Sequence, residues 1–387
     1  MAKRRKKVQT VEAPPVPKGG PRFEYTPWID LIGHAGPRET IEASLRSGRL
    51  HHAWIFHGPR GVGKFTAALG LAGVLLDPTS APDLSGSFAP DPDSPTQELL
   101  RAGSHPDLHV VTKELSVFSS EQRVRASKQR NIPIGVLREF LIDPAARSRV
   151  RSGDSLAGKV LIVDEAHLLD QNGQNAVLKT LEEPAEGTVL ILVTENEDKL
   201  LPTIRSRCQR VVFSPLSDAD LGRWLARPAV QDRLGEVGDL PAWLEAFAEG
   251  SPGAILEAVE GGLAGWHARL GGWFEELPRG TAPGPLGVAM TECIAEQADA
   301  RVKASPLASK EAANQAAGAM LFRYLAVGCR AKLRSARDAH EAAAWASAIE
   351  AIRHAERRLG MNVQMVFVAE AMIVEMTRAF AREPVRA

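Results

Sequence analysis

Residues 53–64 read AWIFHGPRGVGK, and this stretch decides the fold. The apolar run 53–57 predicts a short buried strand, and residues 64–76 have helical spacing. Between them lies the pattern GxxxxGK, in which backbone N–H groups cradle phosphates while the lysine reaches the β- and γ-phosphate oxygens. A strand, such a loop and a helix in this order predict a P-loop domain. The predicted phosphate-binding residues are Gly58, Gly61, Gly63 and Lys64.

The position after the lysine departs from the pattern. A Ser or Thr hydroxyl usually binds Mg²⁺ there, but the chain has Phe65, with Thr66 one place later. One helical residue is a rotation of about 100°, so Thr66 cannot simply substitute, although it stays a candidate nucleotide contact. The sequence therefore predicts a weak or vestigial site for ATP and Mg²⁺, with metal-assisted hydrolysis in doubt.

A second motif, KVLIVDEAH, spans residues 159–167. Its apolar part predicts a central strand. Asp164 at the end of that strand can hold Mg²⁺, and Glu165 can polarise an attacking water. An Asp-Glu pair can also follow a strand by chance, but the loop upstream favours the functional interpretation.

Further strands and helices extend the α/β pattern. Strands are predicted at 160–163, 188–194 and 211–213, and a helix at 174–183. This alternation predicts a mostly parallel sheet that is covered on both faces. After residue 215 the sequence predicts helices only. Residues 363–380 are apolar nearly all round, which indicates burial in a helical bundle or against a partner subunit.

The charge is balanced but unevenly distributed. Lys+Arg and Asp+Glu are both 47, yet residues 1–22 hold seven basic residues and one acid. Residues 1–27 are predicted to be a disordered basic arm, either a solvated tail or a loose contact with nucleic acid. The remainder is mildly acidic, so the overall charge does not predict a nucleic-acid binder.

The three cysteines are far apart and form no CxxC pair, which excludes a zinc ribbon. No apolar run reaches the 18 or so residues of a transmembrane helix, and no apolar segment follows the basic N-terminus. We expect a cytoplasmic protein without zinc or membrane contact.

Residues 77–97 contain five Pro, four Asp and no Lys or Arg, which predicts an inserted loop.

The third motif is Ser206-Arg207-Cys208, between two predicted strands. Arg207 has two interpretations. It is ordinary surface charge, which composition alone favours, or it is an arginine finger that reaches the γ-phosphate held by an adjacent subunit.

Together these motifs resemble the AAA+ clamp-loader subunits of bacterial DNA polymerase III. The resemblance covers residues 28–262 well and the helical C-terminus more loosely. Its motifs are residues 49–64, 101–107, 174–184 and 206–208, of which the run NAVLKTLEEP at 175–184 is the most specific.

Within the family the chain is most similar to the delta-prime type of subunit rather than to the ATP-hydrolysing motor subunits. Phe65 occupies the metal position, and the acidic loop 77–97 lies where relatives carry a cysteine zinc module. The lid segment 250–260 lacks the arginine with which motor subunits sense the γ-phosphate. Lys64, Asp164 and Glu165 are nevertheless retained, so the site is incompletely degenerate.

The resemblance implies a division into an AAA+ domain (28–213), a helical lid (214–262) and a helical collar (263–387). It implies that Arg207 acts in trans on a motor subunit's ATP, and that the chain is not an active ATPase by itself but is part of the DNA-directed DNA polymerase holoenzyme. The implied partners are motor subunits, a delta subunit, the sliding clamp and, through the assembly, primer–template DNA.

Three alternatives stay open. The chain could be a gamma/tau-type motor subunit of the same loader, a stand-alone P-loop enzyme such as a nucleotide kinase, or a replication-linked AAA+ protein outside the loader. The missing lid arginine argues against the first alternative. The long helical C-terminus and the run 175–184 argue against the second.

Overall fold

The computed structural model describes most of the chain and divides it into two compact units, Met1–Trp224 and Leu225–Ala387. The described residues are 23–84, 86–126, 129–147, 149–150, 154–234, 241–279, 286–304, 310–360 and 363–381.

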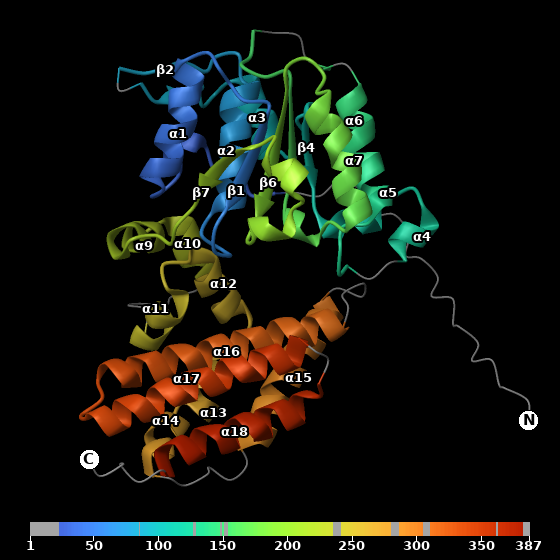
Figure 1. The fold of residues 1–387 in the computed structure, drawn as a ribbon. Coiled ribbons are helices and arrows are strands. Elements are labelled where there is room, and N and C mark those ends of the chain that lie inside the picture. Colours follow the sequence, from blue (N-terminus) through green and yellow to red (C-terminus); the bar gives the residue numbers. More distant parts are fainter. Residues whose placement is uncertain are drawn as a thin grey trace, which may run out of the picture. The chain divides into compact units, whose positions relative to one another are not determined.

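A five-stranded sheet forms the centre of the first unit (Figure 1), with the strand order β4-β5-β6-β1-β7 and every pair parallel. The strands are β4 (Leu108–Val111), β5 (Lys159–Val163), β6 (Thr188–Thr194), β1 (Ala53–His57) and β7 (Gln209–Val212). The predicted parallel α/β fold is confirmed. Strand β4 was not predicted, because it has only four residues and lies at an edge of the sheet, where the apolar signal is weak.

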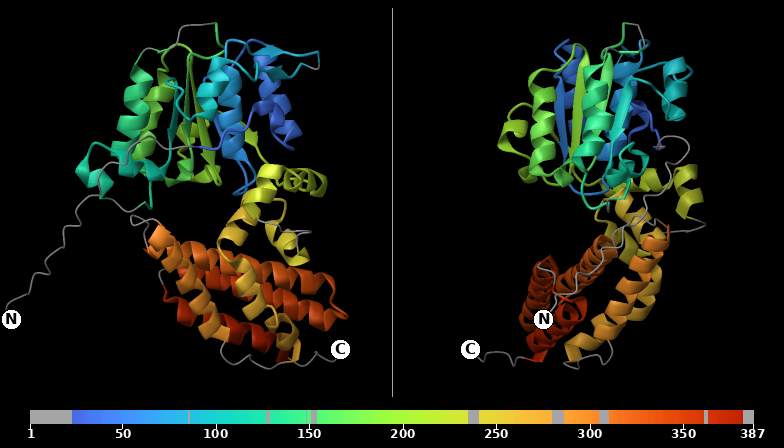
Figure 2. Two further views of the ribbon diagram at one scale, coloured as in Figure 1. Left: turned by 180° about the vertical axis from the view of Figure 1, so that it is seen from behind. Right: turned by 90° about the vertical axis from the view of Figure 1, so that its right-hand side faces the viewer.

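Helices cover both faces of this sheet (Figure 2). Alternate side chains of β1 point to opposite faces, as strand geometry requires. Trp54 and Phe56 pack into one buried cluster with α2, while Ile55 packs into the other with α7. The helices of the first unit are α1 (Ala35–Arg46), α2 (Lys64–Leu76), α3 (Pro95–Arg101), α4 (Gln122–Arg125), α5 (Ile134–Leu137), α6 (Asp143–Ala146), α7 (Gln171–Glu182), α8 (Pro202–Arg205) and α9 (Asp218–Leu225).

The packed part of the chain begins before Trp28, where the sequence analysis placed the start of the domain. Residues 1–22 of the predicted arm lie outside the described residues, but residues 23–27 run along α2. The rings of Phe23 and Phe65 lie 5.4 Å apart, edge to face. The Tyr25 hydroxyl donates to Gln97 at 2.6 Å. These aromatic contacts hold the segment against the core.

Residues 77–97, predicted as an inserted loop, fold into a short hairpin of β2 (Ala81–Pro82) and β3 (Phe88–Ala89), followed by the start of α3. The buried carboxylate of Asp77 organises this segment. It accepts hydrogen bonds from Thr79, Ser94 and Gln97. Within the described residues no group of three or more His, Cys, Asp or Glu side chains is arranged to hold a metal ion.

The second unit contains only helices among its described residues. They are α10 (Pro228–Leu234), α11 (Ala242–Ala248), α12 (Pro252–Glu260), α13 (Leu263–Leu270), α14 (Trp273–Glu276), α15 (Leu286–Ala304), α16 (Lys310–Arg334), α17 (Ala339–Gly360) and α18 (Met365–Ala381). No helix in the described ranges combines the length and apolar character needed to cross a bilayer.

Part of the predicted lid packs onto the later helices. Trp243 of α11 stacks on His267 of α13 at 4.5 Å. Arg323 of α16 lies over the Phe247 ring and donates to the Ala248 carbonyl at 3.0 Å. The lid and collar boundaries remain predictions, since the two units divide at residue 224, inside the predicted lid.

Helix α18 buries one side and exposes apolar side chains on the other. Val368, Met372 and Met376 are buried, whereas Phe367 is 60% exposed and Val374 is 47% exposed. This helix therefore has apolar surface that the described residues leave exposed.

Candidate functional site

The phosphate-type loop joins β1 to α2 in the geometry that the sequence predicted. Gly58, Gly61 and Gly63 all have positive φ angles, of 141°, 75° and 105°. A Cβ atom at Gly58 would lie 2.0 Å from the Phe213 carbonyl oxygen at the end of β7. Only glycine fits a position with both this backbone angle and this close approach.

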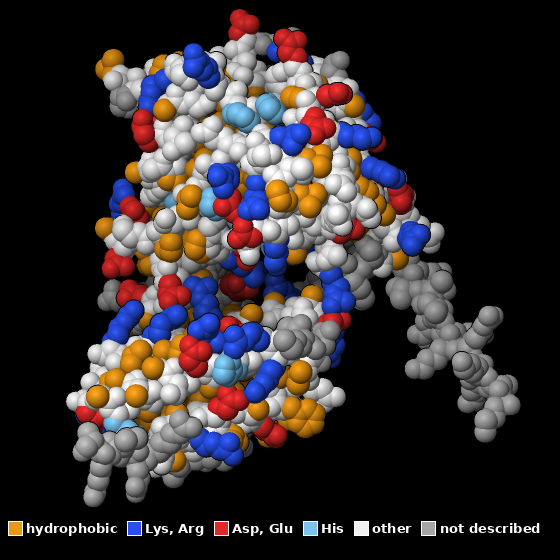
Figure 3. Space-filling model, viewed as in Figure 1, with side chains coloured by type: hydrophobic (Ala, Val, Ile, Leu, Met, Phe, Trp, Pro, Cys, Tyr) orange, Lys and Arg blue, Asp and Glu red, His pale blue; other side chains and the backbone are white. Residues whose placement is uncertain are grey.

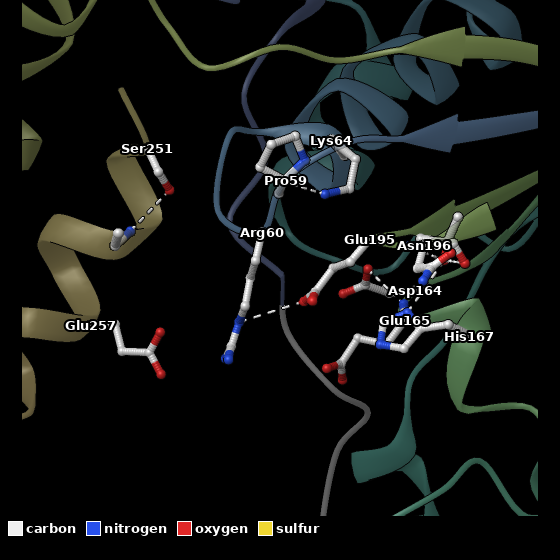
Figure 4. A network of polar contacts seen from close by, with 12 residues as sticks. Pro59, Arg60, Lys64, Asp164, Glu165, His167, Glu195, Asn196, Ser251 and Glu257 are labelled. Atoms are coloured by element: carbon white, nitrogen blue, oxygen red, sulfur yellow. Dashed lines mark hydrogen bonds and ion pairs between the residues drawn. The ribbon is translucent and has the colours of Figure 1, made fainter. Parts of the chain in front are cut away.

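The lysine of the loop is turned inward. Lys64 is 5% exposed, and its Nζ donates to the carbonyls of Gly58 (2.8 Å) and Pro59 (2.6 Å) (Figure 4). Burial lowers the pKa of its ammonium group. The charge that would face phosphate oxygens is thus satisfied by the loop itself.

The acidic side chains predicted to accompany the loop follow β5, at the same edge of the sheet. Because β5, β6 and β1 are adjacent and parallel, the carboxyl ends of β5 and β6 lie at the same edge of the sheet as the loop. Asp164 and Glu165 follow β5. Burial, reinforced by the charge of Glu165, raises the pKa of Asp164 to about 6. Glu165 has a left-handed backbone, with φ 48°, and its N–H donates to Asp164 Oδ1 at 2.9 Å.

One carboxylate oxygen of Glu165 is engaged in an ion pair. The Nζ of Lys113 lies 2.5 Å from Glu165 Oε2. Lys113 begins η2 (Lys113–Phe118), directly after β4, and β4 neighbours β5. This ammonium group stabilises the carboxylate and competes for the proton-accepting lone pairs that general-base catalysis needs. Lys113 was not predicted from the sequence, because strand β4, which positions it, has only a weak local signal.

Two further polar residues, Glu195 and Asn196, follow β6 and lie near Asp164 (Figure 4). Glu195 Oε1 is 3.8 Å from Arg60 Nε on the phosphate-type loop. The Asn196 side chain accepts from the N–H of Asp198 at 2.9 Å. Sequence reasoning missed both residues, although their position directly after a predicted central strand was a usable signal.

His34 also contacts the loop and was not singled out from the sequence. It has a left-handed backbone (φ 59°) just before α1. Its Nε2 lies 2.7 Å from the Val62 carbonyl oxygen, and its ring is 4.9 Å from the Phe213 ring. Burial lowers the pKa of the imidazole, so a neutral ring with Nε2–H donating to Val62 is favoured.

The residues present fit a phosphate group better than they fit Mg²⁺. The glycine loop and Lys64 have the required backbone and charge. At the position of the metal-binding hydroxyl, however, the Phe65 ring packs on Phe23. Thr66 is half-buried one position farther along α2. The usual pairing of a hydroxyl with Asp164 at a metal is therefore missing.

Arg207 lies in a separate place, on the segment between α8 and β7. Its side chain is 39% exposed, and its Nη2 is 2.9 Å from Glu182 Oε1 at the end of α7. Its Nη1 donates to the Thr203 carbonyl at 3.0 Å. The partners of Arg207 thus lie on α7 and α8. Charged side chains of both signs are interspersed on the face of the molecule shown in Figure 3.

A buried glutamine fixes the segment that leads to Arg207. Gln174 of α7 donates to the Lys199 carbonyl at 3.0 Å and accepts from the N–H of Leu201 at 2.7 Å. Cys208 is half-buried against the core, and burial raises the pKa of its thiol to about 12. It is a small apolar packing residue.

Comparison with known proteins identifies the relatives of this region. Residues 34–217 match the family model described as "DNA polymerase III, delta subunit". The chain is 31% identical over 218 residues to DNA polymerase III subunit delta' of Bacillus subtilis, covering 56% of this chain and 55% of that protein. It is 34% identical over 203 residues to subunit delta' of Pseudomonas aeruginosa, covering 52% and 53%.

The chain is thus similar in sequence to subunits named delta'. This finding confirms the resemblance read from the sequence. The chain is also 31% identical over 255 residues to the gamma/tau subunit of DNA polymerase III from Mycobacterium bovis, covering 63% of this chain and 38% of that protein. The chain spans about half the length of the delta' relatives it matches, and the family-model match at residues 34–217 lies within the first unit.

Proposed function

We propose that this chain acts as a delta-prime-type subunit of a DNA polymerase III clamp loader and supplies Arg207 to the ATP site of a neighbouring gamma/tau-type subunit. In this role it helps an assembly with motor and delta subunits to place a sliding clamp on primed DNA. The similarity to delta' proteins supports this function.

The observation that carries the proposal is the contrast between the chain's own site and its arginine. In its own site, Phe65 replaces the metal-binding hydroxyl and Lys113 pairs with Glu165. Arg207 instead remains partly exposed beside the end of α7. A group that acts on a neighbour's nucleotide must be accessible and held in place, and it needs no metal site in its own chain.

The exposed apolar side of α18 offers a surface for contact with another subunit. Phe367 and Val374 are exposed there, together with Val366 at 42%. Exposed apolar side chains grouped on one helix are typical of a contact with another protein. We propose that this side faces another subunit of the loader.

The test compares ATP hydrolysis by the chain alone with hydrolysis by its complex with the gamma/tau-type subunit, delta subunit, clamp and primed DNA. We expect no measurable ATP hydrolysis by the lone chain. We expect Arg207→Ala to lower the hydrolysis of the complex by about 100-fold or more while the complex still assembles. Lys64→Ala in this chain should leave that hydrolysis unchanged.

The second candidate is a motor subunit, and one observation favours it. Lys64, Asp164 and Glu165 are all retained and lie beside the loop (Figure 4). Hydrolysis by the lone chain that is lost on Lys64→Ala and unaffected by Arg207→Ala would establish this candidate and refute the finger donor.

A further inference from the structure

The carboxylate of Glu182 is the closest charged neighbour of Arg207. Glu182 is the last residue of α7, within the run 175–184, and its Oε1 lies 2.9 Å from Arg207 Nη2. On the other side of the guanidinium, the Thr203 carbonyl accepts from Nη1 at 3.0 Å. The two terminal nitrogens are therefore each held by a different element.

We propose that Glu182 is a positioning residue for Arg207, which fixes the plane of the guanidinium so that its remaining N–H groups can meet a neighbour's phosphate. This inference rests on the proposed function in trans. A guanidinium is a planar fork with five donors. Two anchored nitrogens define its plane, and the unused donors stay available for an anion.

The two anchors belong to one rigid block. Helix α7 is fixed to the core by Val177 and Leu181, which are both buried. Gln174 of the same helix bonds to Lys199 and Leu201, directly before α8. Glu182 and Thr203 therefore keep their spacing. The orientation of the guanidinium between them is fixed before a partner subunit binds.

The exposure of the pair makes its role testable apart from folding. The side chains of Arg207 and Glu182 are 39% and 49% exposed. An ion pair this accessible contributes little to stability, because water and salt screen it. Removing Glu182 should leave the fold intact, so that a change in activity reports the orientation of Arg207.

The same region provides matched controls. Glu183 is the next residue and is also exposed. Arg205 and Asp198 form a similar exposed pair at 2.7 Å, two residues away from Arg207 in sequence. Glu183→Ala and Asp198→Ala remove the same kind of charge without removing the Arg207 anchor.

The experiment measures steady-state hydrolysis by the complex with the gamma/tau-type subunit, as kcat and as KM for ATP. Glu182→Ala should lower kcat by about 10-fold with little change in KM, because orientation is lost and binding is not. Glu182→Gln should keep part of the rate, since its amide oxygen still accepts a hydrogen bond. Both control variants should match the wild type, and all variants should unfold at the same temperature.

A double variant separates the possible failures. In an Arg207→Ala background, Glu182→Ala should have no further effect, because it acts through Arg207. If Glu182→Ala has the wild-type kcat while Arg207→Ala is severely impaired, Glu182 does not position Arg207, but the proposed role of Arg207 in trans is retained. The same conclusion holds if the double variant loses kcat by the product of the two single losses. If Arg207→Ala itself has no effect, the proposed function fails.

Discussion

The phosphate-type loop and the Arg207 segment lie in the same α/β unit, yet they differ in how their charges are used. Around the loop, Lys64 donates to two carbonyls of its own loop and Glu165 is paired with Lys113. Beside α7, the Arg207 guanidinium is anchored at two nitrogens and still 39% exposed. The comparison shows that a P-loop can retain its backbone geometry while its lysine is bonded internally. The positive charge that is accessible to solvent then lies elsewhere, on Arg207.

Gly58→Ala should have the largest effect on stability, because a Cβ atom at this position is incompatible with the backbone conformation of the loop. The new Cβ would meet the Phe213 carbonyl at 2.0 Å and force a φ of 141° on alanine. We expect a loss of about 3 kcal/mol or more in the free energy of unfolding, measured with denaturant. Gly36→Ala is the control, since its Cβ would meet nothing within 4 Å and it lies in α1. A Gly58→Ala protein as stable as the wild type would show that the loop is not held in this form.

Phe65→Thr sharpens the comparison by restoring a hydroxyl at the metal position. Loss of the Phe23 contact should cost about 1–2 kcal/mol in unfolding free energy. Binding of a fluorescent ATP analogue should become stronger with Mg²⁺ than with EDTA. Phe65→Ala controls for the lost ring and should show no Mg²⁺ dependence. If Phe65→Thr also shows none, the aromatic residue is not what weakens the site.

Asp164→Asn should stabilise the nucleotide-free chain at pH 8. The pKa of this carboxyl is raised to about 6, mainly by burial, so the folded state disfavours the charged form. The wild type therefore loses stability as pH rises from below 4 through 6, and the amide avoids that loss. The pKa shift corresponds to about 3 kcal/mol, and solvent screening of the half-buried side chain reduces the expected gain to about 1–2 kcal/mol at pH 8 and close to zero at pH 4. Thermal unfolding of both proteins at the two pH values measures it, and an equal gain at both would contradict the stated cause.

Lys113→Met should have the smallest effect on stability, below about 1 kcal/mol, because the ion pair with Glu165 is partly exposed. This variant tests whether the Lys113 ion pair or Phe65 prevents ATP hydrolysis at the chain's own site. We expect hydrolysis by the lone variant to stay at background, since Phe65 still occupies the metal position. Measurable hydrolysis would instead identify Lys113 as the restraint. Lys332→Met, which removes an exposed pair in the helical unit, is a suitable control.

The strongly patterned elements were predictable because their signals are local. Strands β1 and β6 and helix α2 have the predicted bounds, since continuous apolar runs and helical spacing are properties of neighbouring residues. Helix α7 begins at Gln171 rather than at the predicted residue 174, because Asp170 caps it by accepting from the N–H of Gly173. Ser251 caps α12 in the same way by accepting from the N–H of Ala254, with Pro252 in the first turn.

The sequence by itself determined the P-loop, the acidic end of β5, the replacement at Phe65 and the presence of Arg207, because each is a matter of residue type at a fixed spacing. Only the tertiary structure decided the partners of these residues. Lys113 reaches Glu165 across 52 positions because β4 and β5 are neighbours in the sheet. Glu182 reaches Arg207 because α7 ends beside α8. Such pairs depend on how distant elements pack, and no local pattern encodes that packing.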